Sequence, residues 1–394
     1  WLKLGSGAAG RGTGAHRRLV APAATRLEPK GAAMKAVRER MKKSLQIKTK
    51  NTGPGSGRKC IRALSDIEFS KIYKLGGQVM ESTNSGMQVL FATRLADGVE
   101  VVVKTREKAK SFKSSAEERE WRSTTEVQLN MPKVETICEY MEVLETKDFY
   151  FVVMEKVEGK DLFEHMCSEH LKQVDAREII RQILDALKTM HGMGRIHKDL
   201  KLENVMVDME SPKRKLSQAS QQECPDSPAG VKLIDFDTMQ DWEPSSPKSR
   251  DVLGTDGYIA PEAYAGEYSP ASDMYCAGVI MYKLLTGKFP SRADIFDDLP
   301  GENWVGSPAM RRIQDRLKSE RIDFSRPPLD RCTEAAELCA QLLAFEPTER
   351  PTAEEALRHG WFQVDARLLS PPPSPDTRRR SAACATPRLP GEPS

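Results

Sequence analysis

The chain has 394 residues, of which 39% are hydrophobic and 30% are charged, the balance of a soluble globular protein. It contains no run of 18 apolar residues, which argues against a transmembrane helix, and its eight cysteines form no CxxC pair, which argues against a zinc site or a disulfide framework. The net charge of +3 is uneven, because residues 1–65 carry 16 Lys and Arg against two acids (16 − 2 = +14), leaving 3 − 14 = −11 for the rest.

Residues 1–66 are expected to form a basic, mostly disordered arm, since they combine Gly and Pro breakers with little apolar periodicity. The chain does not begin with Met, so its true start is expected to be missing. Met34, Val37, Met41 and Leu45 recur at helical spacing among basic residues. This stretch fits a calmodulin-binding or acid-binding helix, or a helix without a specific partner. Nucleic-acid binding by the arm is a further, less favoured reading.

The body of the chain changes from strand patterns to helix patterns. Short β-rich runs cover 71–75, 87–94 and 99–105, with Asp97-Gly98 as a hairpin signal. A polar helix is predicted over 116–129, followed by strands over 141–146 and 149–155. Beyond Val174 the spacing is helical, and one face carries five apolar residues: Ile179, Ile180, Ile183, Leu184 and Leu187. These patterns predict an α+β protein, with a small β-rich lobe and one main helix before a larger, mainly helical lobe.

Two further stretches lack periodicity. Residues 208–230 are rich in Ser, Gln and Pro and predict a flexible surface insertion. Residues 363–394 form a Pro-, Ser- and Arg-rich tail that is predicted to be disordered.

The segment IHKDLKLENVMV, residues 196–207, resembles the catalytic loop of eukaryotic protein kinases, usually written HRDLKPEN. The resemblance implies that Asp199 accepts or orients the proton of a substrate hydroxyl and that Lys201 neutralises the transferring phosphate. Asn204 is implied as a metal ligand. His197 is expected to be a buried supporting residue.

Two later motifs extend the resemblance. LIDFDT places Asp235 where the family keeps the metal-binding Asp of its DFG motif, with Asp237 in place of the Gly. Asp tolerates the left-handed region that Gly adopts freely, so the backbone geometry is expected to survive. GTDGYIAPE, residues 254–262, matches the end of the activation segment and implies that Thr255 hydrogen-bonds Asp199 and Lys201.

Three scaffold residues follow from the same comparison. Glu262 is implied to form a buried ion pair with Arg350 of ERPTAEEALRHGWF, and Asp273 to hold the backbone of the catalytic loop. Loss of one partner of such a buried pair costs about 3–5 kcal/mol.

The small lobe supplies the implied nucleotide contacts. Lys104 in VVVK matches the lysine that grips the phosphates, and its partner is predicted to be Glu126, with Glu120 as the rival. The glycine-rich loop is irregular, and Gly86 with Val89 are its predicted ATP contacts. In FVVMEKVEGKDLF, the resemblance makes Met154 the gatekeeper and assigns adenine binding to backbone groups of Glu155 and Val157.

Together the motifs imply the bilobal kinase fold over 67–362, with an N-lobe at 67–156 and a C-lobe at 157–362. They are most similar to the calcium/calmodulin-dependent class of serine/threonine kinases, which implies ATP and Mg²⁺ as cofactors, protein substrates and no membrane. A cytoplasmic or nuclear, reducing location is expected. The alternative is a pseudokinase scaffold, supported by Asp237, the irregular loop and Lys198 in place of Arg.

Two hypotheses concern regulation and substrates. Lys198 and Asp251 are predicted to pair in place of an Arg–phosphate clamp, which would make the enzyme active as synthesised. Asp161 and Glu203 match acidic positions that receive an upstream Arg in basophilic relatives, whereas Lys283 counts against this preference.

Overall fold

The computed structural model describes residues 58–80, 86–168, 171–208 and 230–363. The predicted basic helix at 34–45, the insertion between residues 208 and 230, and the C-terminal tail lie outside these ranges. No helix in the described ranges is long and apolar enough to cross a membrane.

A six-stranded sheet forms the N-lobe, with strand order β1-β5-β6-β4-β3-β2. Its strands are β1 (Arg62–Ala63), β2 (Tyr73–Met80), β3 (Met87–Arg94), β4 (Glu100–Glu107), β5 (Tyr140–Glu145) and β6 (Phe149–Glu155). All neighbours pair antiparallel except β1 and β5. The predicted hairpin is present, because Gly98 has φ of 72° and donates to the Arg94 carbonyl at 2.8 Å between β3 and β4.

The folded region begins earlier than the predicted boundary at residue 67. Arg62 in β1 pairs with Leu144, and helix α2 (Asp66–Ile72) starts at a capping box formed by Ser65 and Glu68. Phe69 of this helix stacks on Phe151 with ring centroids 3.9 Å apart. Residues 62–66 therefore belong to the sheet lobe and not to the arm.

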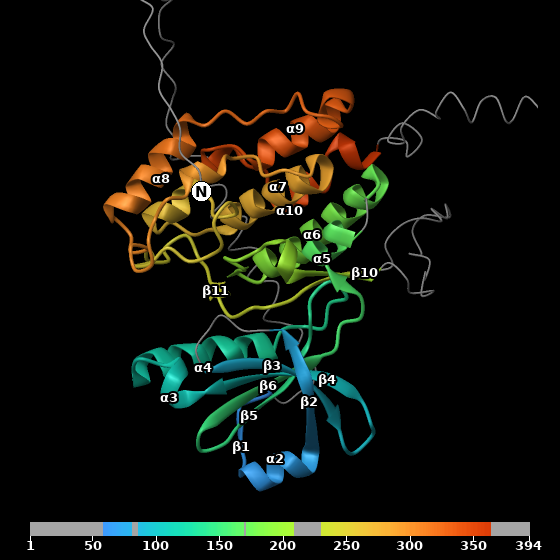
Figure 1. The fold of residues 1–394 in the computed structure, drawn as a ribbon, viewed down its shortest axis with the longest axis vertical. Helices are drawn as coiled ribbons and strands as arrows, with labels where there is room; N and C mark the ends of the chain where they lie inside the picture. The colour runs from blue at the N-terminus through green and yellow to red at the C-terminus, as the bar shows by residue number, and fades with distance from the viewer. Residues whose placement is uncertain (1–57, 81–85, 169–170, 209–229, 364–394) are drawn as a thin grey trace, which may run out of the picture. The chain divides into compact units, whose positions relative to one another are not determined.

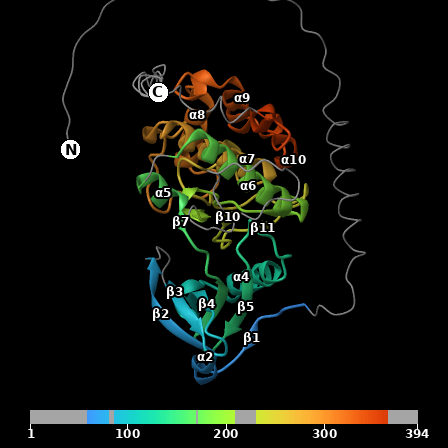
Figure 2. The same cartoon turned by 90° about the vertical axis from the view of Figure 1, so that its right-hand side faces the viewer.

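Helices α3 (Lys108–Ser111) and α4 (Ser115–Leu129) follow β4. Figures 1 and 2 show α4 beside the sheet, on the side facing the helical lobe. Ser114 caps α4 by accepting from the Glu117 amide, and the helix buries Thr125, Gln128 and Leu129. The polar helix predicted over 116–129 is thus confirmed.

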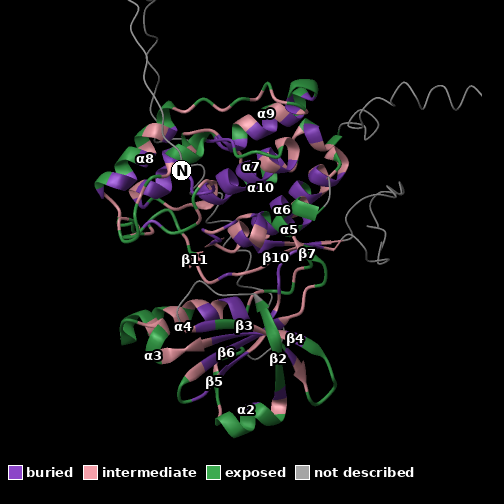
Figure 3. Cartoon of the chain, viewed as in Figure 1, coloured by how far each residue is buried: buried purple, intermediate pink, exposed green. Residues whose placement is uncertain are grey.

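The C-lobe is mainly helical. Its α-helices are α5 (Leu162–Ser168), α6 (Gln173–Gly192), α7 (Pro270–Thr286), α8 (Pro308–Ser319), α9 (Thr333–Leu342) and α10 (Ala353–Ala356). Its 3₁₀ turns are η2 (Leu202–Asn204), η3 (Pro261–Ala265), η4 (Ala293–Ile295), η5 (Leu329–Arg331), η6 (Pro347–Glu349) and η7 (Gly360–Gln363). The five apolar residues predicted on one face of α6 are all fully buried, and α7 is buried along nearly its whole length (Figure 3).

Short strands fix the loops between these helices. They are β7 (Lys160–Asp161), β8 (Arg195–Ile196), β9 (Val205–Asp208), β10 (Gly230–Leu233) and β11 (Gln240–Asp241). The hairpin β9–β10 pairs with β7, and β8 pairs with β11. The segment 197–204 therefore leaves one strand and enters another, which holds both of its ends in place.

Candidate active site

The loop at 197–204 is anchored from below by Asp273 of α7. Its two carboxylate oxygens accept from the backbone amides of His197 and Lys198 at 2.9 and 3.0 Å, and His191 lies 2.9 Å from Oδ2. Burial acts to raise the pKa of Asp273, but its bonds and charge interactions with the two histidines outweigh burial and hold it below its ordinary value. The side chain of His197 is fully buried with its ring 5.3 Å from that of Phe236, as expected of a supporting residue.

Asp199 lies at the centre of a compact polar group. Its Oδ1 accepts from the Thr255 hydroxyl at 2.8 Å, and its Oδ2 lies 3.2 Å from the Lys201 amine. Lys201 also donates to the Thr255 hydroxyl at 2.9 Å. The two contacts of Thr255 are those that the resemblance implied, and they join the loop at 197–204 to the segment before η3. The result is a fixed carboxylate beside a fixed positive charge.

Asn204 and Asp235 provide the oxygen donors of a candidate metal site. Asn204 donates its amide N–H to the Asp199 carbonyl at 2.8 Å, and no described residue donates to its Oδ1. Amide and carboxylate oxygens are the ligands that Mg²⁺ prefers. The backbone of Asp235 has φ of 57°, whereas Asp237 is absent from the described non-glycine residues with positive φ. The expectation of a left-handed Asp237 is therefore wrong, and the strained position is Asp235.

Lys104 in β4 binds two carboxylates of the neighbouring segment. Its amine lies 2.7 Å from Asp235 Oδ1 and 2.9 Å from Asp237 Oδ2. Burial acts to lower the pKa of Lys104, but the charges of Asp237 and Asp235 outweigh burial and raise it. Burial acts to raise the pKa of Asp235, yet Lys104 holds it below its usual value.

The prediction that Glu126 pairs with Lys104 is wrong. Glu126 Oε1 accepts instead from the backbone amide of Ile61 at 3.3 Å, before β1. The rival Glu120 is exposed. Thr125, the residue before Glu126, is buried instead; the two side chains point in different directions because a helix rotates by about 100° per residue.

Some of the other predicted nucleotide contacts have free backbone groups, and others are already bonded within the protein. Val89 pairs with Lys104 across β3 and β4, and Met154 is buried in β6. No described residue bonds the backbone N–H or C=O of Val157, which leaves both available. The Glu155 amide donates to the Glu139 carbonyl at 3.1 Å. Gly86 has φ of 76° and accepts from the Glu107 amide, so a turn already requires this glycine.

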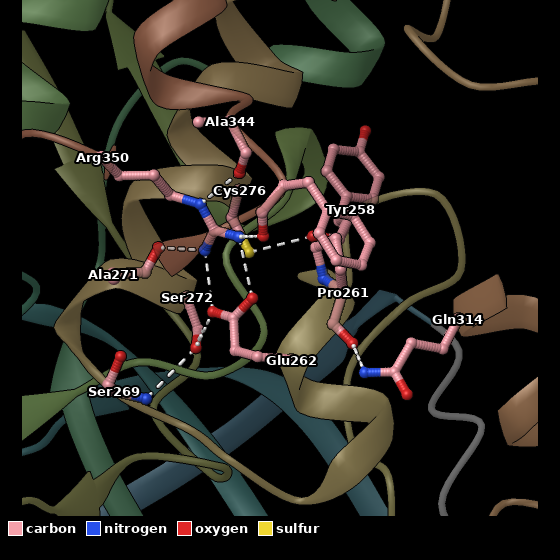
Figure 4. Close-up of polar contacts among 11 residues, drawn as sticks. Tyr258, Pro261, Glu262, Ser269, Ala271, Ser272, Cys276, Gln314, Ala344 and Arg350 are labelled. Carbon is pink, nitrogen blue, oxygen red and sulfur yellow. Dashed lines mark hydrogen bonds and ion pairs between the residues drawn. The ribbon is translucent and has the colours of Figure 1, made fainter. Parts of the chain in front are cut away.

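The predicted pair of Glu262 and Arg350 is present and deeply buried (Figure 4). Two parallel bonds of 2.7 and 2.8 Å join the guanidinium to the carboxylate, and Ser272 donates to Glu262 at 2.8 Å. Arg350 also donates to the backbone carbonyls of Ala271, Ala344 and Phe345. One side chain thereby ties together η3, α7 and the segment after α9.

The predicted pair of Lys198 and Asp251 is wrong. The Lys198 amine donates to Gln240 Oε1 at 3.0 Å and lies 4.2 Å from the ring centroid of Tyr268. Asp251 is exposed and its backbone bridges Trp304. Tyr268 accepts from the Leu253 amide at 2.6 Å and donates to the Leu253 carbonyl at 2.8 Å. Tyr268 was missed because it follows the sequence motifs and is joined to Lys198 only by the fold.

Comparisons with known proteins agree with this geometry. The profile of the family described as Protein kinase domain matches residues 84–362. Calcium-dependent protein kinase 24 of Arabidopsis thaliana is 30% identical over 244 residues, covering 61% of this chain and 37% of that protein. Calcium-dependent protein kinase 8 of the same plant is 27% identical over 317 residues, covering 80% and 53%. Calcium/calmodulin-dependent protein kinase type II subunit delta of Oryctolagus cuniculus is 31% identical over 225 residues, covering 56% and 37%.

The chain therefore belongs to the protein kinase family, and its resemblance is to the calcium/calmodulin-dependent class. It spans 37% to 56% of the length of the curated relatives it matches. Membership of this family implies use of ATP and a divalent metal, and the bilobal α+β fold agrees with it.

Proposed function

We propose that this domain is a serine/threonine protein kinase that transfers the γ-phosphate of Mg·ATP to Ser and Thr hydroxyls of other proteins. The observation that carries the proposal is the group formed by Asp199, Lys201 and Thr255, with its bonds of 2.8 and 2.9 Å and its ion pair of 3.2 Å. Phosphoryl transfer needs positioning and charge stabilisation more than covalent chemistry. This group supplies both.

Each residue has a defined task in this proposal. Asp199 orients the substrate hydroxyl and accepts its proton, while Lys201 neutralises charge on the phosphate that moves. Lys104 holds the phosphates that stay behind. A Mg²⁺ ion held by Asn204 and Asp235 would supply further neutralisation of the phosphate charge when bound. Thr255 fixes Asp199 and Lys201 relative to each other from the activation segment.

The test is transfer of ³²P from Mg·ATP to matched peptides that differ only in a Ser, Thr, Tyr or Ala acceptor. Asp199→Asn should lower kcat by about 10² or more, the usual loss for a missing general base. Asp148→Asn is the matched control, since Asp148 is exposed in the turn between β5 and β6. If a folded wild-type protein phosphorylates neither peptides nor itself, the domain is a scaffold.

The substrate preference proposed is for basic residues upstream of the acceptor. Glu203 Oε2 is buried and has no hydrogen-bond partner among the described residues, so an incoming guanidinium would satisfy it. Lys283 forms no ion pair of 4 Å or less with Glu203: its amine lies 3.7 Å from the ring centroid of Phe289, and burial lowers its pKa although the charge of Glu203 acts to raise it. Asp161 Oδ1 already accepts from the Glu164 amide and contributes less. A peptide library without preference for upstream Arg would contradict this assignment.

We also propose a partner for the basic stretch at 34–45 and a location for the protein. We infer that the basic stretch at 34–45 is the contact for calmodulin or another acidic partner, which binding of the full chain to calmodulin with calcium or with EGTA would test. The reducing, intracellular location is inferred from cysteine usage, and the six described cysteines are all free.

A further inference from the structure

Asp237 occupies a place where protein kinases ordinarily have no charge. Its Oδ2 lies 2.9 Å from the Lys104 amine and 3.5 Å from Nη2 of Arg106, which follows Lys104 by two residues on the same face of β4. The side chain of Asp237 is 20% exposed and that of Lys104 is 11% exposed. Asp237 is thus a largely buried carboxylate clamped by two cations of one strand.

Helix α4 offers no replacement for this carboxylate. No glutamate of the described chain lies within 4 Å of the Lys104 amine, whose ion pairs there are with Asp235 and Asp237. The four glutamates of α4 face elsewhere: Glu117 caps, Glu118 accepts from Tyr150, Glu120 is exposed and Glu126 accepts from Ile61. Thr125 lines a small cavity together with Asp237. The α4 residues that line this cavity, Thr125 among them, carry no carboxylate.

The reaction requires an anchor for Lys104 that is independent of the metal. In protein kinases a helix glutamate holds the phosphate-binding lysine while the DFG aspartate binds the metal. Asp235 contacts Lys104 through Oδ1 at 2.7 Å, so a cation held by Asp235 would compete with Lys104 for the charge of this carboxylate.

We propose, on the basis of the kinase function above, that Asp237 is the positioning residue that replaces the helix glutamate and holds the Lys104 amine in place to meet the nucleotide phosphates. Asp237, which departs from the family's DFG motif, then compensates for the glutamate that α4 does not place at Lys104. α4 also contacts the second cation of this group, because the ring centroid of Trp121 lies 5.0 Å from the Arg106 guanidinium.

The primary test compares Asp237→Asn, which keeps the shape and removes the charge, with Asp241→Asn. Asp241 is an exposed aspartate of the same segment, 67% exposed, and its ion-pair partner is Arg195. Binding of the non-hydrolysable analogue AMP-PNP with Mg²⁺ is measured by calorimetry, together with kcat and KM for ATP. Asp237→Asn should weaken AMP-PNP binding and kcat/KM by about 30-fold or more, the lower end of the loss for truncating one partner of a buried charge pair, and Asp241→Asn should change neither.

Two further variants distinguish positioning from general structural damage. In a Lys104→Met background, Asp237→Asn should have no additional effect on AMP-PNP binding, because its action passes through Lys104. In an Asp237→Gly background, Thr125→Glu should restore part of kcat/KM, while in the wild type it should not raise it. Circular dichroism and melting temperature confirm that each variant is folded.

The experiments distinguish a failure of the proposed role of Asp237 from a failure of the kinase function. If the wild type transfers phosphate but Asp237→Asn binds AMP-PNP and turns over like the wild type, the role of Asp237 is refuted and the kinase function stands. If Asp237→Asn shifts only the Mg²⁺ concentration required at saturating ATP, Asp237 is a metal ligand and the role is likewise refuted. If no protein transfers phosphate, the kinase function fails, and the AMP-PNP comparison still decides whether Asp237 positions Lys104.

Discussion

Replacement of Arg350 should destabilise the C-lobe more than any surface change of the same chemistry. The Arg350 side chain is 0% exposed and that of Glu262 is 7% exposed. Removing one partner of such a pair leaves the other charge buried, at about 3–5 kcal/mol. Three backbone carbonyls also lose a donor, each worth about 1 kcal/mol. Arg350→Met should therefore consume most of a stability that is ordinarily about 5–15 kcal/mol.

A milder change makes this loss measurable. Arg350→Lys keeps the charge but removes the bidentate geometry, since an ammonium cannot bond both carboxylate oxygens and three carbonyls in the same directions. We expect a loss of about 3–4 kcal/mol, roughly half of the loss of about 6–8 kcal/mol that the buried charge and the three carbonyls give for Arg350→Met. The matched control is Arg358→Lys, because Arg358 pairs with Glu354 on the surface with the two side chains 69% and 54% exposed. That pair should contribute about 0.5 kcal/mol or less.

Urea unfolding followed by circular dichroism gives the free energy of unfolding for each variant. A double variant, Glu262→Leu with Arg350→Met, tests the stated cause. It should be more stable than Arg350→Met alone, because no unpaired charge is left buried. Equal losses for Arg350→Lys and Arg358→Lys, or a double variant less stable than the single one, would refute the reasoning.

Two further predictions concern Lys198 and the segment it contacts. Burial lowers the pKa of Lys198 to about 8, so between pH 8 and 10.5 the unfolded chain binds more protons than the folded chain and stability rises with pH. In urea unfolding, the wild type should therefore gain about 2 kcal/mol relative to Lys198→Met when the pH is raised from 7 to 9.5. A difference between the two proteins that stays constant with pH would contradict this. Tyr268→Phe removes both hydrogen bonds to the backbone of Leu253 and should lower kcat. Phosphatase treatment should leave the kcat of the wild type unchanged, because Tyr268 holds the segment around Leu253 without a phosphate. A wild type inactivated by phosphatase would show that a phosphate is needed after all.

Much of the fold was predictable because it depends on local patterns. The buried face of α6 and the hairpin at Asp97-Gly98 follow from periodicities of 3.6 and 2 and from a turn that needs positive φ. The capping box of Ser65 and Glu68 was also visible in the sequence and would have placed α2 within the domain. The contacts of Asp199 and Thr255 were predictable since their motifs are contiguous and carry fixed spacing.

The partners of Lys104 and Lys198 could not be predicted, because they depend on the direction in which side chains point and not on spacing along the sequence. Glu126 and Thr125 are adjacent in sequence, but about 100° of helix rotation separates a side chain that meets Ile61 from one that faces Asp237. Spacing along the sequence cannot decide which of these two neighbouring side chains faces Lys104. Lys198 posed the same difficulty in another form, because its partners come from β11 and from the segment before α7, which only the packed lobe brings together.

The two departures from the kinase pattern near Lys104 are Asp237 in place of a glycine and the missing inward glutamate of α4. They have a common explanation once it is known which way these side chains point. Taken singly, Asp237 adds a charge beside Asp235, the proposed metal ligand, and the lack of an inward glutamate among the described residues of α4 removes the partner of Lys104; each change alone argues for a defective enzyme. Together they conserve the number of carboxylates around Lys104, at 2.7 and 2.9 Å from its amine. A residue that breaks a motif is therefore evidence against catalysis only when the structure shows that no neighbour has taken over the lost contact.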